Sequence, residues 1–383
     1  MEPDKVMLVT DEQVNSLHGD YFSAIEANCG DGETGSACPA VKLEKFVLPN
    51  GDACKSWDNL KALVDWSFES GATKRSVVVA FGGGAVLNVT GLYASISYRG
   101  MKLVYVPTTF LAMHDVVTSL KTSICHMGRK NNIGSFYVPQ KILIDTALCR
   151  TLPKGELFSG LGELCKNAAL FGGEHYDGFV EALSKESIDM GNGGSGEEFS
   201  LSRDTLVSLV RLGIKAKMDL LADDAYEKKH GMVFEYGHTM SHAIEKAYGD
   251  GTVPHGLGVV YGMTACSYAA EKMGIMSAKE REQHDELCDM LLSRYPLPQP
   301  MPSVEKVMDN AMKDSKRGIT QEAPEEISDI LLTRIGEILP TPKSNLSKFP
   351  SKYFEEWLVA RGFPQEKCKA CCVCGRTPCQ SSA

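Results

Sequence analysis

Short apolar runs alternate with longer, helix-like stretches through the first part of the chain. Residues 5–14 are typical of a strand that enters a turn, with Thr10 or Asp11 placed to cap a following helix. Further strand-like runs, rich in apolar and β-branched residues, occupy residues 75–84, 102–109 and 140–146. Strands that alternate with helices predict an α/β fold with a doubly wound parallel sheet.

The pattern changes from Leu157 onward to long helical stretches, which predict a second, mainly α-helical domain. Residues 184–198 interrupt it as a low-complexity loop, residues 327–342 predict a strand pair or hairpin, and residues 352–363 predict a closing amphipathic helix. The cysteine-rich end has CxxC spacings that would suit a metal, but it lacks core-forming residues. The predicted regions are an N-terminal domain over 1–152, a helical domain over 153–364 and a disordered tail over 365–383.

Charge and composition narrow the possible partners. A formal net charge of -9 argues against nucleic acid, because binding to backbone phosphates needs a surplus of Lys and Arg. No stretch reaches the roughly 18 apolar residues of a membrane span, and the first residues lack the layout of a signal peptide. The 13 cysteines, mostly scattered singly, fit reduced thiols better than a disulfide framework. We therefore expect a cytoplasmic protein whose ligand is a small anion.

The strand-like run at 75–84 ends in Gly82, Gly83 and Gly84. Glycines at the end of a strand let the backbone approach a ligand, and the following helix N-terminus offers N–H groups to a pyrophosphate. The spacing is not the usual GxGxxG, and three glycines alone are more often a tight turn. Thr108 and Thr109, which end the next strand, add two hydroxyls that could reach a ribose or phosphate.

Lysines gather after that strand. Lys121 follows Asp115 by six positions, and Lys130 and Asn131 follow in RKNNIG. Lysines beside Ser and Thr in a short loop can be simply solvated. Their position beside an otherwise apolar, glycine-bounded region favours phosphate binding instead.

Charged and histidine residues in the helical part offer a metal site. Glu163 and Lys166 are three apart and share a helix face among apolar neighbours, as an internal ion pair or as ligand-binding groups. His238 and His242 are four apart on one helix face, and His255 precedes another apolar helix. Each histidine alone is more often structural. Two histidines plus a carboxylate with an open position form a known catalytic zinc arrangement.

Taken in order, these segments resemble the dehydroquinate synthase family of sugar-phosphate cyclases. The resemblance runs across residues 5–340 and rests on GGGAVLNVTG, VPTTFLAMHD, KNNIGSFYVPQ, SGLGELCKN and EYGHTMSHAIE. It implies a Rossmann-like NAD-binding domain followed by a helical domain that binds zinc or cobalt. It also implies a homodimer.

The resemblance assigns roles to individual positions. The metal ligands would be Glu163, His238 and His255. The residues around NAD would be Gly82, Gly83, Gly84, Asn88, Thr108, Thr109, Asp115, Lys130, Thr151 and Leu152. The substrate-binding residues would be Asp115, Lys121, Lys130, Asn131, Lys166, Lys217, Glu235, His242 and Lys316. The catalytic residues among them would be Lys121, Lys166, Glu235 and His242.

Departures from the dehydroquinate synthase pattern bear on the substrate. In that enzyme an arginine and an asparagine, seven and three residues before the GHT histidine, bind the substrate carboxylate and a hydroxyl. Here these positions hold Gly231 and Glu235. Glycine cannot make the bidentate contact that a carboxylate needs, and a glutamate would repel one. Asn88 replaces the usual aspartate, and TSLKTS replaces the usual GGK loop. These features resemble the inosose-forming branch of the family, whose substrate, glucose 6-phosphate, has no carboxylate.

The resemblance also implies the reaction. NAD removes hydride from C4, phosphate leaves by β-elimination, the hydride returns, and an intramolecular aldol step closes the carbocycle. Dehydroquinate synthase itself and the sedoheptulose 7-phosphate cyclases stay open as alternatives. A metal-dependent alcohol or polyol dehydrogenase would share the architecture, but it has no reason to hold Lys121, Asn131 and Lys166 around a phosphate. A non-catalytic scaffold with the same fold is the last alternative.

Overall fold

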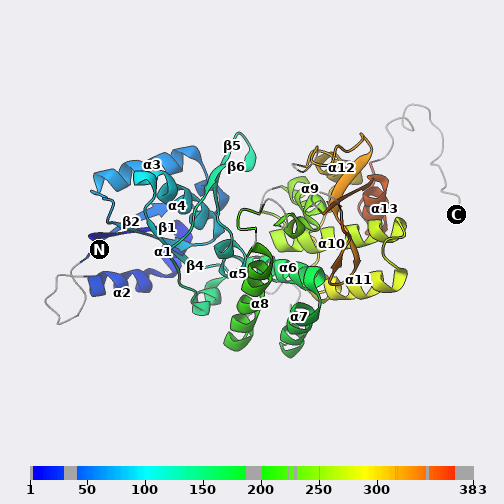
Figure 1. Ribbon diagram of the computed structural model, residues 1–383, viewed down its shortest axis with the longest axis horizontal. Coiled ribbons are helices and arrows are strands. Elements are labelled where there is room, and N and C mark those ends of the chain that lie inside the picture. Colours follow the sequence, from blue (N-terminus) through cyan, green and yellow to red (C-terminus); the bar gives the residue numbers. More distant parts are fainter. Residues whose placement is uncertain are drawn as a thin grey trace. The chain divides into compact units, whose positions relative to one another are not determined.

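The computed structural model describes residues 3–29, 41–186, 201–222, 224–227, 231–249, 251–314, 316, 318–341 and 345–366. The chain forms two compact units (Figure 1). The first unit comprises residues 1–164 and 178–231, and the second comprises residues 165–177 and 232–383. Residues 187–198 of the predicted loop and residues 367–383 of the predicted tail lie outside the described residues.

A parallel sheet forms the core of the first unit. Its strand order is β2 (Lys42–Leu48), β1 (Lys5–Asp11), β3 (Val77–Gly82), β4 (Lys102–Pro107) and β7 (Lys141–Ile142). Every neighbouring pair is parallel, with Lys5 opposite Lys42 and Val77 opposite Lys102. Met7, Val9 and Val78 are fully buried, as expected of parallel strands whose apolar side chains form the core. The predicted α/β fold with a parallel sheet is confirmed.

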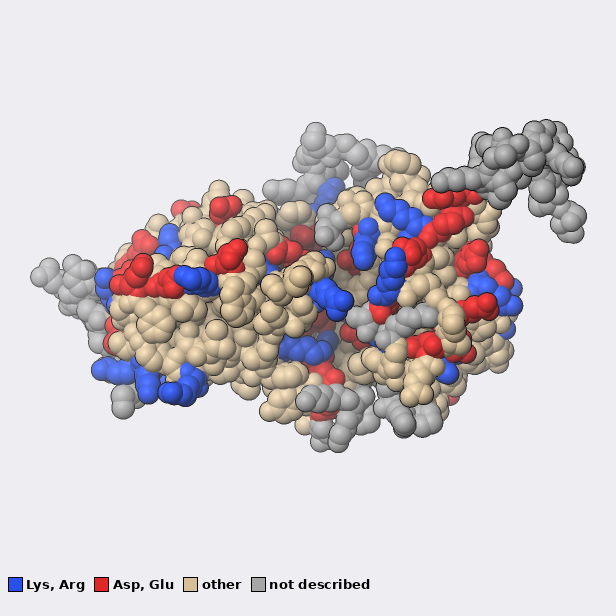
Figure 2. All heavy atoms as spheres, turned by 90° about the horizontal axis from the view of Figure 1, so that it is seen from above, with Lys and Arg blue, Asp and Glu red and all other residues tan. Residues whose placement is uncertain are grey.

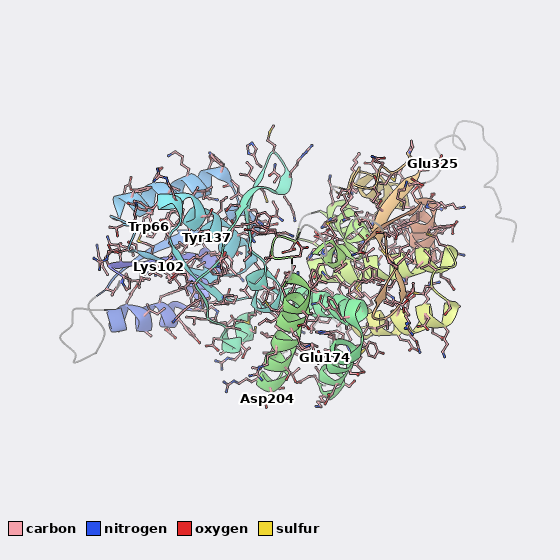
Figure 3. The ribbon with its side chains drawn as sticks, in the orientation of Figure 1. Trp66, Lys102, Tyr137, Glu174, Asp204 and Glu325 are labelled. Carbon is pink, nitrogen blue, oxygen red and sulfur yellow. The ribbon has the colours of Figure 1, made fainter. Side chains whose placement is uncertain are left out.

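Helices and short 3₁₀ turns connect these strands. The helices are α1 (Glu12–Leu17), α2 (Gly19–Cys29), α3 (Trp57–Glu69), α4 (Gly84–Ile96), α5 (Phe110–His114) and α8 (Arg203–Leu221). The 3₁₀ turns are η1 (Gly51–Cys54), η2 (Ser97–Arg99), η3 (Val116–Thr118) and η4 (Thr146–Thr151). Asp11 caps α1 by accepting a hydrogen bond of 2.8 Å from the Val14 N–H. Trp66 of α3 packs on Phe46 of β2 at 5.1 Å between ring centroids (Figure 3).

An antiparallel hairpin of β5 (Lys121–His126) and β6 (Arg129–Phe136) packs beside α4. The sequence reasoning predicted no strand here and placed the lysines beside Ser and Thr in a short loop, which is wrong, because Lys121 begins β5 and Lys130 lies in β6. Most side chains of β6 are exposed. The strand therefore lacks the apolar alternation by which a half-buried strand is recognised.

Helices dominate the second unit. The helices that lie wholly in this unit are α9 (His238–Tyr248), α10 (His255–Lys272), α11 (Ala278–Leu292), α12 (Val304–Ala311) and α13 (Lys352–Ala360). The unit also contains the end of α6 (Lys154–Phe171), the start of α7 (Gly173–Lys185) and most of the 3₁₀ turn η5 (Gly231–Glu235). Two small antiparallel pairs join β8 (Glu326–Ile330) to β11 (Leu346–Pro350) and β9 (Leu332–Arg334) to β10 (Glu337–Ile338). The β9–β10 pair matches the hairpin expected within 327–342.

Two glycines bring α9 and α10 into close contact. Gly237 has φ +77°, and a Cβ there would lie 2.7 Å from the Met263 nitrogen. A Cβ on Gly262 would lie 1.9 Å from the Gly237 carbonyl oxygen. Glycine at both positions therefore permits a contact that any side chain would prevent. This contact fixes the start of α9 against α10.

The packing of α8 bears on the domain boundary. α8 contacts α5, and Gly213 of α8 lies so close to His114 that a Cβ would be 2.8 Å from its ring. The helix therefore groups with the sheet rather than with the helices that follow it. The predicted division after residue 152 stays a prediction.

The surface carries both signs of charge. On the face shown in Figure 2, Lys and Arg side chains are interspersed with Asp and Glu. Within the described part of the chain, no helix has the length and apolarity needed to cross a membrane.

Candidate functional site

Three imidazoles gather where α9 and α10 begin. His238 is the first residue of α9, His242 lies one turn later, and His255 is the first residue of α10. The ring centroids of His238 and His255 are 5.2 Å apart, and those of His238 and His242 are 5.5 Å apart. The spacing of four residues and the close approach of α9 to α10 together explain this cluster.

A buried carboxylate holds the start of α9. Asp329 of β8 accepts hydrogen bonds from the Gly237 N–H at 3.1 Å and the Thr239 N–H at 3.2 Å. These N–H groups belong to the end of the helix that otherwise lacks acceptors. Burial raises the pKa of Asp329, and the positive charge of Lys316 opposes only part of this shift, so the pKa is raised to about 6. Asp329 thereby anchors the turn that presents His238.

Glu163 completes a donor set with two of these imidazoles. It lies on α6, a single continuous helix, and is 2% exposed. One ligand atom from each of Glu163, His238 and His255 lies within 4.8 Å of the others. A carboxylate and two imidazoles at this spacing suit a divalent cation and leave a position for water or substrate. The structure thus brings together the three predicted metal ligands.

The Nδ1 atom of each histidine in this set has an oxygen partner. His255 Nδ1 lies 2.9 Å from Glu245 Oε1, and His238 Nδ1 lies 3.2 Å from the Tyr236 carbonyl oxygen. Ser241 also donates to Glu245, at 2.8 Å. Burial by itself raises the pKa of Glu245, but its hydrogen bond with His255 leaves the pKa below the usual value. When Nδ1 donates to an oxygen, Nε2 is left to bind a metal, so the residues fit the expected ion.

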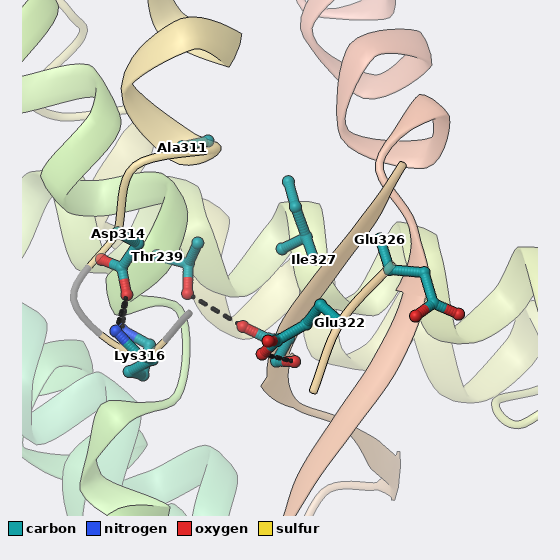
Figure 4. A pocket seen from close by; sticks show the side chains of 8 residues that line it. Thr239, Ala311, Asp314, Lys316, Glu322, Glu326 and Ile327 are labelled. Atoms are coloured by element: carbon teal, nitrogen blue, oxygen red, sulfur yellow. Dashed lines mark hydrogen bonds and ion pairs between the residues drawn. The ribbon is translucent and has the colours of Figure 1, made fainter. Parts of the chain in front are cut away.

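Several charged residues lie beside His242. His242 Nδ1 lies 3.2 Å from Asp314 Oδ2. Lys316 Nζ lies 3.0 Å from Asp314 Oδ1, and Figure 4 shows this pair. Lys316 Nζ also lies 3.4 Å from Glu235 Oε2. Burial raises the pKa of Glu235, but nearby His238 and Lys316 hold it well below its usual range. Three predicted substrate residues, Glu235, His242 and Lys316, are therefore linked.

Lys166 is the fourth predicted substrate residue of the second unit. It is 1% exposed, and its Nζ donates to the Phe234 carbonyl oxygen at 2.7 Å. The ammonium also lies 5.4 Å from the centre of the Phe234 ring. This arrangement holds the buried Lys166 ammonium against Phe234, the residue that precedes Glu235 in the sequence.

The glycine turn of the first unit lies between β3 and α4. Gly83 is the N-cap of α4, and a Cβ there would lie 2.9 Å from Thr109 Cγ2. A Cβ on Gly82 would lie 2.6 Å from Val86. The Thr108 N–H donates to the Gly82 carbonyl oxygen at 3.0 Å. The turn therefore depends on small residues and leads directly into a helix N-terminus, as a pyrophosphate site would require.

The other residues predicted to bind NAD lie in several parts of the first unit. Thr109 caps α5 through the Ala112 N–H at 3.2 Å, and Asn88 Nδ2 donates to the Gly84 carbonyl oxygen at 2.8 Å. Thr151 Oγ1 lies 3.1 Å from His18 Nε2, and Leu152 follows it as the C-cap of η4. Their roles toward NAD stay predictions.

Asp115 and Lys217 form an ion pair of 2.9 Å within the first unit. The Lys217 side chain is 6% exposed. Burial lowers the pKa of Lys217, but Asp115 and Glu227 outweigh that effect and raise it. Lys217 therefore stays protonated beside a carboxylate, which is the state needed to bind an anion.

The hairpin residues have partners of their own. Lys121 Nζ pairs with Glu227 at 2.5 Å, and Ser119 donates to the same carboxylate at 2.6 Å. Lys130 lies 3.2 Å from Asp52. Asn131 Oδ1 accepts hydrogen bonds from Lys55 and, at 3.0 Å, from Ser123. Ser123 also donates to Asn88 at 3.2 Å.

Sequence reasoning missed several charged residues of these networks. Glu245 and Asp314 hold His255 and His242, Glu227 pairs with Lys121, and Lys55 is a buried lysine beside Asn131. Glu245 could have been found, because it lies three residues after His242 on the same helix. The other partnerships join distant segments, for which the sequence offers no spacing signal.

Comparison with known proteins shows which families and enzymes this chain resembles. A family model described as the 3-dehydroquinate synthase N-terminal domain matches residues 45–159, and the C-terminal model of that family matches residues 160–317. The chain is 35% identical to a 2-deoxy-scyllo-inosose synthase of Streptomyces ribosidificus over 91% of this chain and 83% of that protein. It is 35% identical to the same enzyme of Streptomyces fradiae over 93% of this chain and 77% of that protein.

A solved structure gives the same result. The chain is similar to a crystal structure of 2-deoxy-scyllo-inosose synthase complexed with carbaglucose-6-phosphate, NAD+ and Co2+. The TM-score is 0.78 at 26% identity, over 94% of this chain and 92% of the other.

Proposed function

The chain belongs to the 3-dehydroquinate synthase family, and we propose that it is an NAD- and metal-dependent sugar-phosphate cyclase that converts glucose 6-phosphate into a carbocycle. The observation that carries the proposal is the convergence of Glu163, His238 and His255, in a chain that matches both family models. In reaction class, the enzyme would be a lyase that eliminates phosphate.

The choice of glucose 6-phosphate rests on two positions. A Cβ on Gly231 would lie 2.5 Å from Glu227 Cβ, so a long cationic side chain at this position would require a rearrangement. Glu235 carries a negative charge that repels a substrate carboxylate but accepts hydrogen bonds from sugar hydroxyls. Both features favour a neutral sugar ring over a carboxylated one. The inosose synthases of Streptomyces, at 35% identity, support the same choice.

Two bound groups would supply the central chemistry. Glu163, His238 and His255 would hold one divalent metal, and the turn of Gly82, Gly83 and Gly84 with Thr108 would lie against NAD. The metal would acidify a sugar hydroxyl, and NAD would accept and later return a hydride. NAD is therefore regenerated in each turnover.

The side chains of the protein would bind and orient the phosphosugar. We assign ring hydroxyls to Glu235 and His242, with Lys316 holding Glu235 in place. We assign the phosphate to Lys121, Lys217 and Asn131, with Lys130 and Asp115 beside them. Lys121 and Lys166 would stabilise the negative charge of the leaving phosphate by supplying fixed positive charges. The elimination needs no other base, because the departing phosphate can itself accept the proton.

Phosphate release tests the proposal directly. The purified protein, NAD and Co2+ would be incubated separately with glucose 6-phosphate, sedoheptulose 7-phosphate and the phosphorylated precursor of dehydroquinate. We expect phosphate release mainly from glucose 6-phosphate, without accumulation of NADH. Predominant turnover of the carboxylated precursor would instead identify a dehydroquinate synthase. Steady NADH formation from a simple polyol would identify a dehydrogenase.

The assembly and location belong to the same proposal. We expect a homodimer in the cytoplasm, as the family resemblance and the composition suggest. Light scattering of the purified protein measures the number of chains in the assembly.

A further inference from the structure

Asp314 connects two of the proposed substrate residues. Its Oδ2 lies 3.2 Å from His242 Nδ1, and its Oδ1 lies 3.0 Å from Lys316 Nζ. Oδ1 also accepts a hydrogen bond of 2.9 Å from the Lys316 N–H. The carboxylate is 6% exposed, and it lines a pocket with Lys316 and Thr239 (Figure 4). Both oxygens are therefore used, one toward each partner.

Helix packing fixes this carboxylate relative to α9. α12 packs on α9, and Asn310 Nδ2 of α12 donates to the Ala243 carbonyl oxygen at 3.3 Å. The chain then leaves α12, and the Asp314 N–H donates to the Ala311 carbonyl oxygen at 3.2 Å. Asp314 thus reaches His242 from a position set by a neighbouring helix, so its contact with the imidazole is not a chance surface encounter.

The contact determines which ring nitrogen of His242 faces a ligand. An ionised carboxylate only accepts hydrogen bonds, so the Nδ1 atom beside Asp314 must carry a proton. Nε2 is then the ring atom available to a substrate hydroxyl. The His242 side chain is 44% exposed, so a ligand can reach it. Without Asp314 the imidazole could rotate or change tautomer, because no other residue in the described part of the chain makes a hydrogen bond with Nδ1.

We propose that Asp314 is a positioning residue, which holds His242 with the proton on Nδ1 and presents Nε2 to the phosphosugar while also orienting Lys316. This inference rests on the proposed function, because it assumes that His242 and Lys316 contact the substrate. Asp314 itself does not touch the sugar. The competing explanation is that Asp314 only anchors the chain after α12.

A double-mutant cycle separates these explanations. The variants are Asp314→Ala, the conservative Asp314→Asn, His242→Gln and the double variant, with Asp309→Asn as the control. Asp309 is a 63% exposed carboxylate of α12 that pairs with Lys313. We expect Asp314→Ala to lower kcat for phosphate release from glucose 6-phosphate about 10- to 100-fold. Asp314→Asn should recover part of that loss, because its amide oxygen can still accept from Nδ1.

In the His242→Gln background, Asp314→Ala should lower kcat by a clearly smaller factor than in the wild type, because one of its two partners is already absent, and the loss that remains reports on Lys316. The Asp309→Asn control should match the wild type. Co2+ binding should stay unchanged in every variant. Fully multiplicative losses in the double variant would overturn the proposal, since Asp314 would then act without His242. Should Asp314→Ala fail to fold, the same comparison made with Asp314→Asn decides the question.

A spectroscopic measurement does not depend on turnover. Nitrogen-15 spectra of the imidazoles report which ring nitrogen carries the proton, and subtraction of the His242→Gln spectrum assigns the signal. We expect the proton on Nδ1 in the wild type and a mixture of tautomers in Asp314→Ala. A wild-type signal with the proton on Nε2 alone would overturn the proposal. If no phosphosugar is turned over, the proposed function fails, whereas these spectra still test the role of Asp314.

Discussion

The histidine cluster of the second unit and the lysines of the first unit are built in opposite ways. In the histidine cluster, His238, His242 and His255 each have a defined partner at Nδ1, and the helices that carry them are locked by glycine contacts. In the first unit, Lys121 and Lys130 lie on a hairpin, with side chains 52% and 56% exposed. The imidazoles are thus already oriented as metal ligands would be. The lysines are paired with carboxylates of the protein itself.

The difference shows where precise geometry is needed. A metal requires its ligands at fixed positions, and this explains the surrounding hydrogen bonds. A phosphate requires positive charge, and the Lys121 side chain is half exposed, so an anion can reach its ammonium group. The Glu227 side chain is buried, and it keeps the hydrogen bond from Ser119 when Lys121 turns to the anion. Glu227 and Asp52 are the carboxylate partners that an anion would replace.

Loss of the carboxylate ligand should have the largest effect. Glu163→Ala removes one of three groups proposed to hold the metal, and several kcal/mol of charge stabilisation depend on that ion. We expect phosphate release from glucose 6-phosphate to fall at least about 1000-fold, even with excess Co2+. Glu181→Ala, on the exposed face of α7, is the control and should retain full activity. Near wild-type release by Glu163→Ala would contradict the assignment of Glu163 as a ligand.

Separating α9 from α10 should have the next largest effect. Gly262→Ala places a Cβ 1.9 Å from the Gly237 carbonyl oxygen, so the helices must move apart. We expect the free energy of unfolding to fall by about 3 kcal/mol, measured by urea denaturation. Gly178→Ala is the matched control, because its Cβ would lie 3.4 Å from the flexible Leu212 side chain. An equal loss of stability in both variants would contradict the importance of the α9–α10 contact.

Weakening the support of His255 should affect the metal and not the fold. Glu245→Gln removes the charge that holds Nδ1 of His255 but keeps the size of the side chain. We expect Co2+ affinity to fall about 10- to 100-fold, measured by equilibrium dialysis. The exposed Glu282→Gln of α11 is the control. Unchanged affinity in Glu245→Gln would show that His255 needs no carboxylate partner.

The smallest effect is expected at the exposed lysine. Lys121→Met removes one positive charge from the proposed phosphate site, so kcat/KM for glucose 6-phosphate should fall about tenfold. Co2+ affinity should not change, and this distinguishes the two regions. Lys61→Met, another exposed lysine paired with a carboxylate, is the control. A loss of metal affinity in Lys121→Met would contradict the separation of the two regions.

The same contrast explains what could be predicted from the sequence. Strands β1, β3 and β4 were predictable because their apolar runs are largely buried, whereas β6 was missed because its side chains are mostly exposed. His238, His242 and His255 could be proposed from helical spacing. Asp314 could not, since it reaches His242 across 72 positions through the packing of α12 on α9. Lys55 and Glu227 were missed because their partners, Asn131 and Lys121, also lie far from them in the sequence.

The central claim is that Glu163, His238 and His255 together hold one divalent metal ion. The most direct test is a titration of the purified protein with Co2+, followed by the visible absorption of the bound ion. We predict one ion per chain and an absorption band that is absent from Glu163→Ala. A Glu163→Ala protein that binds Co2+ with the affinity and spectrum of the wild type would contradict the account.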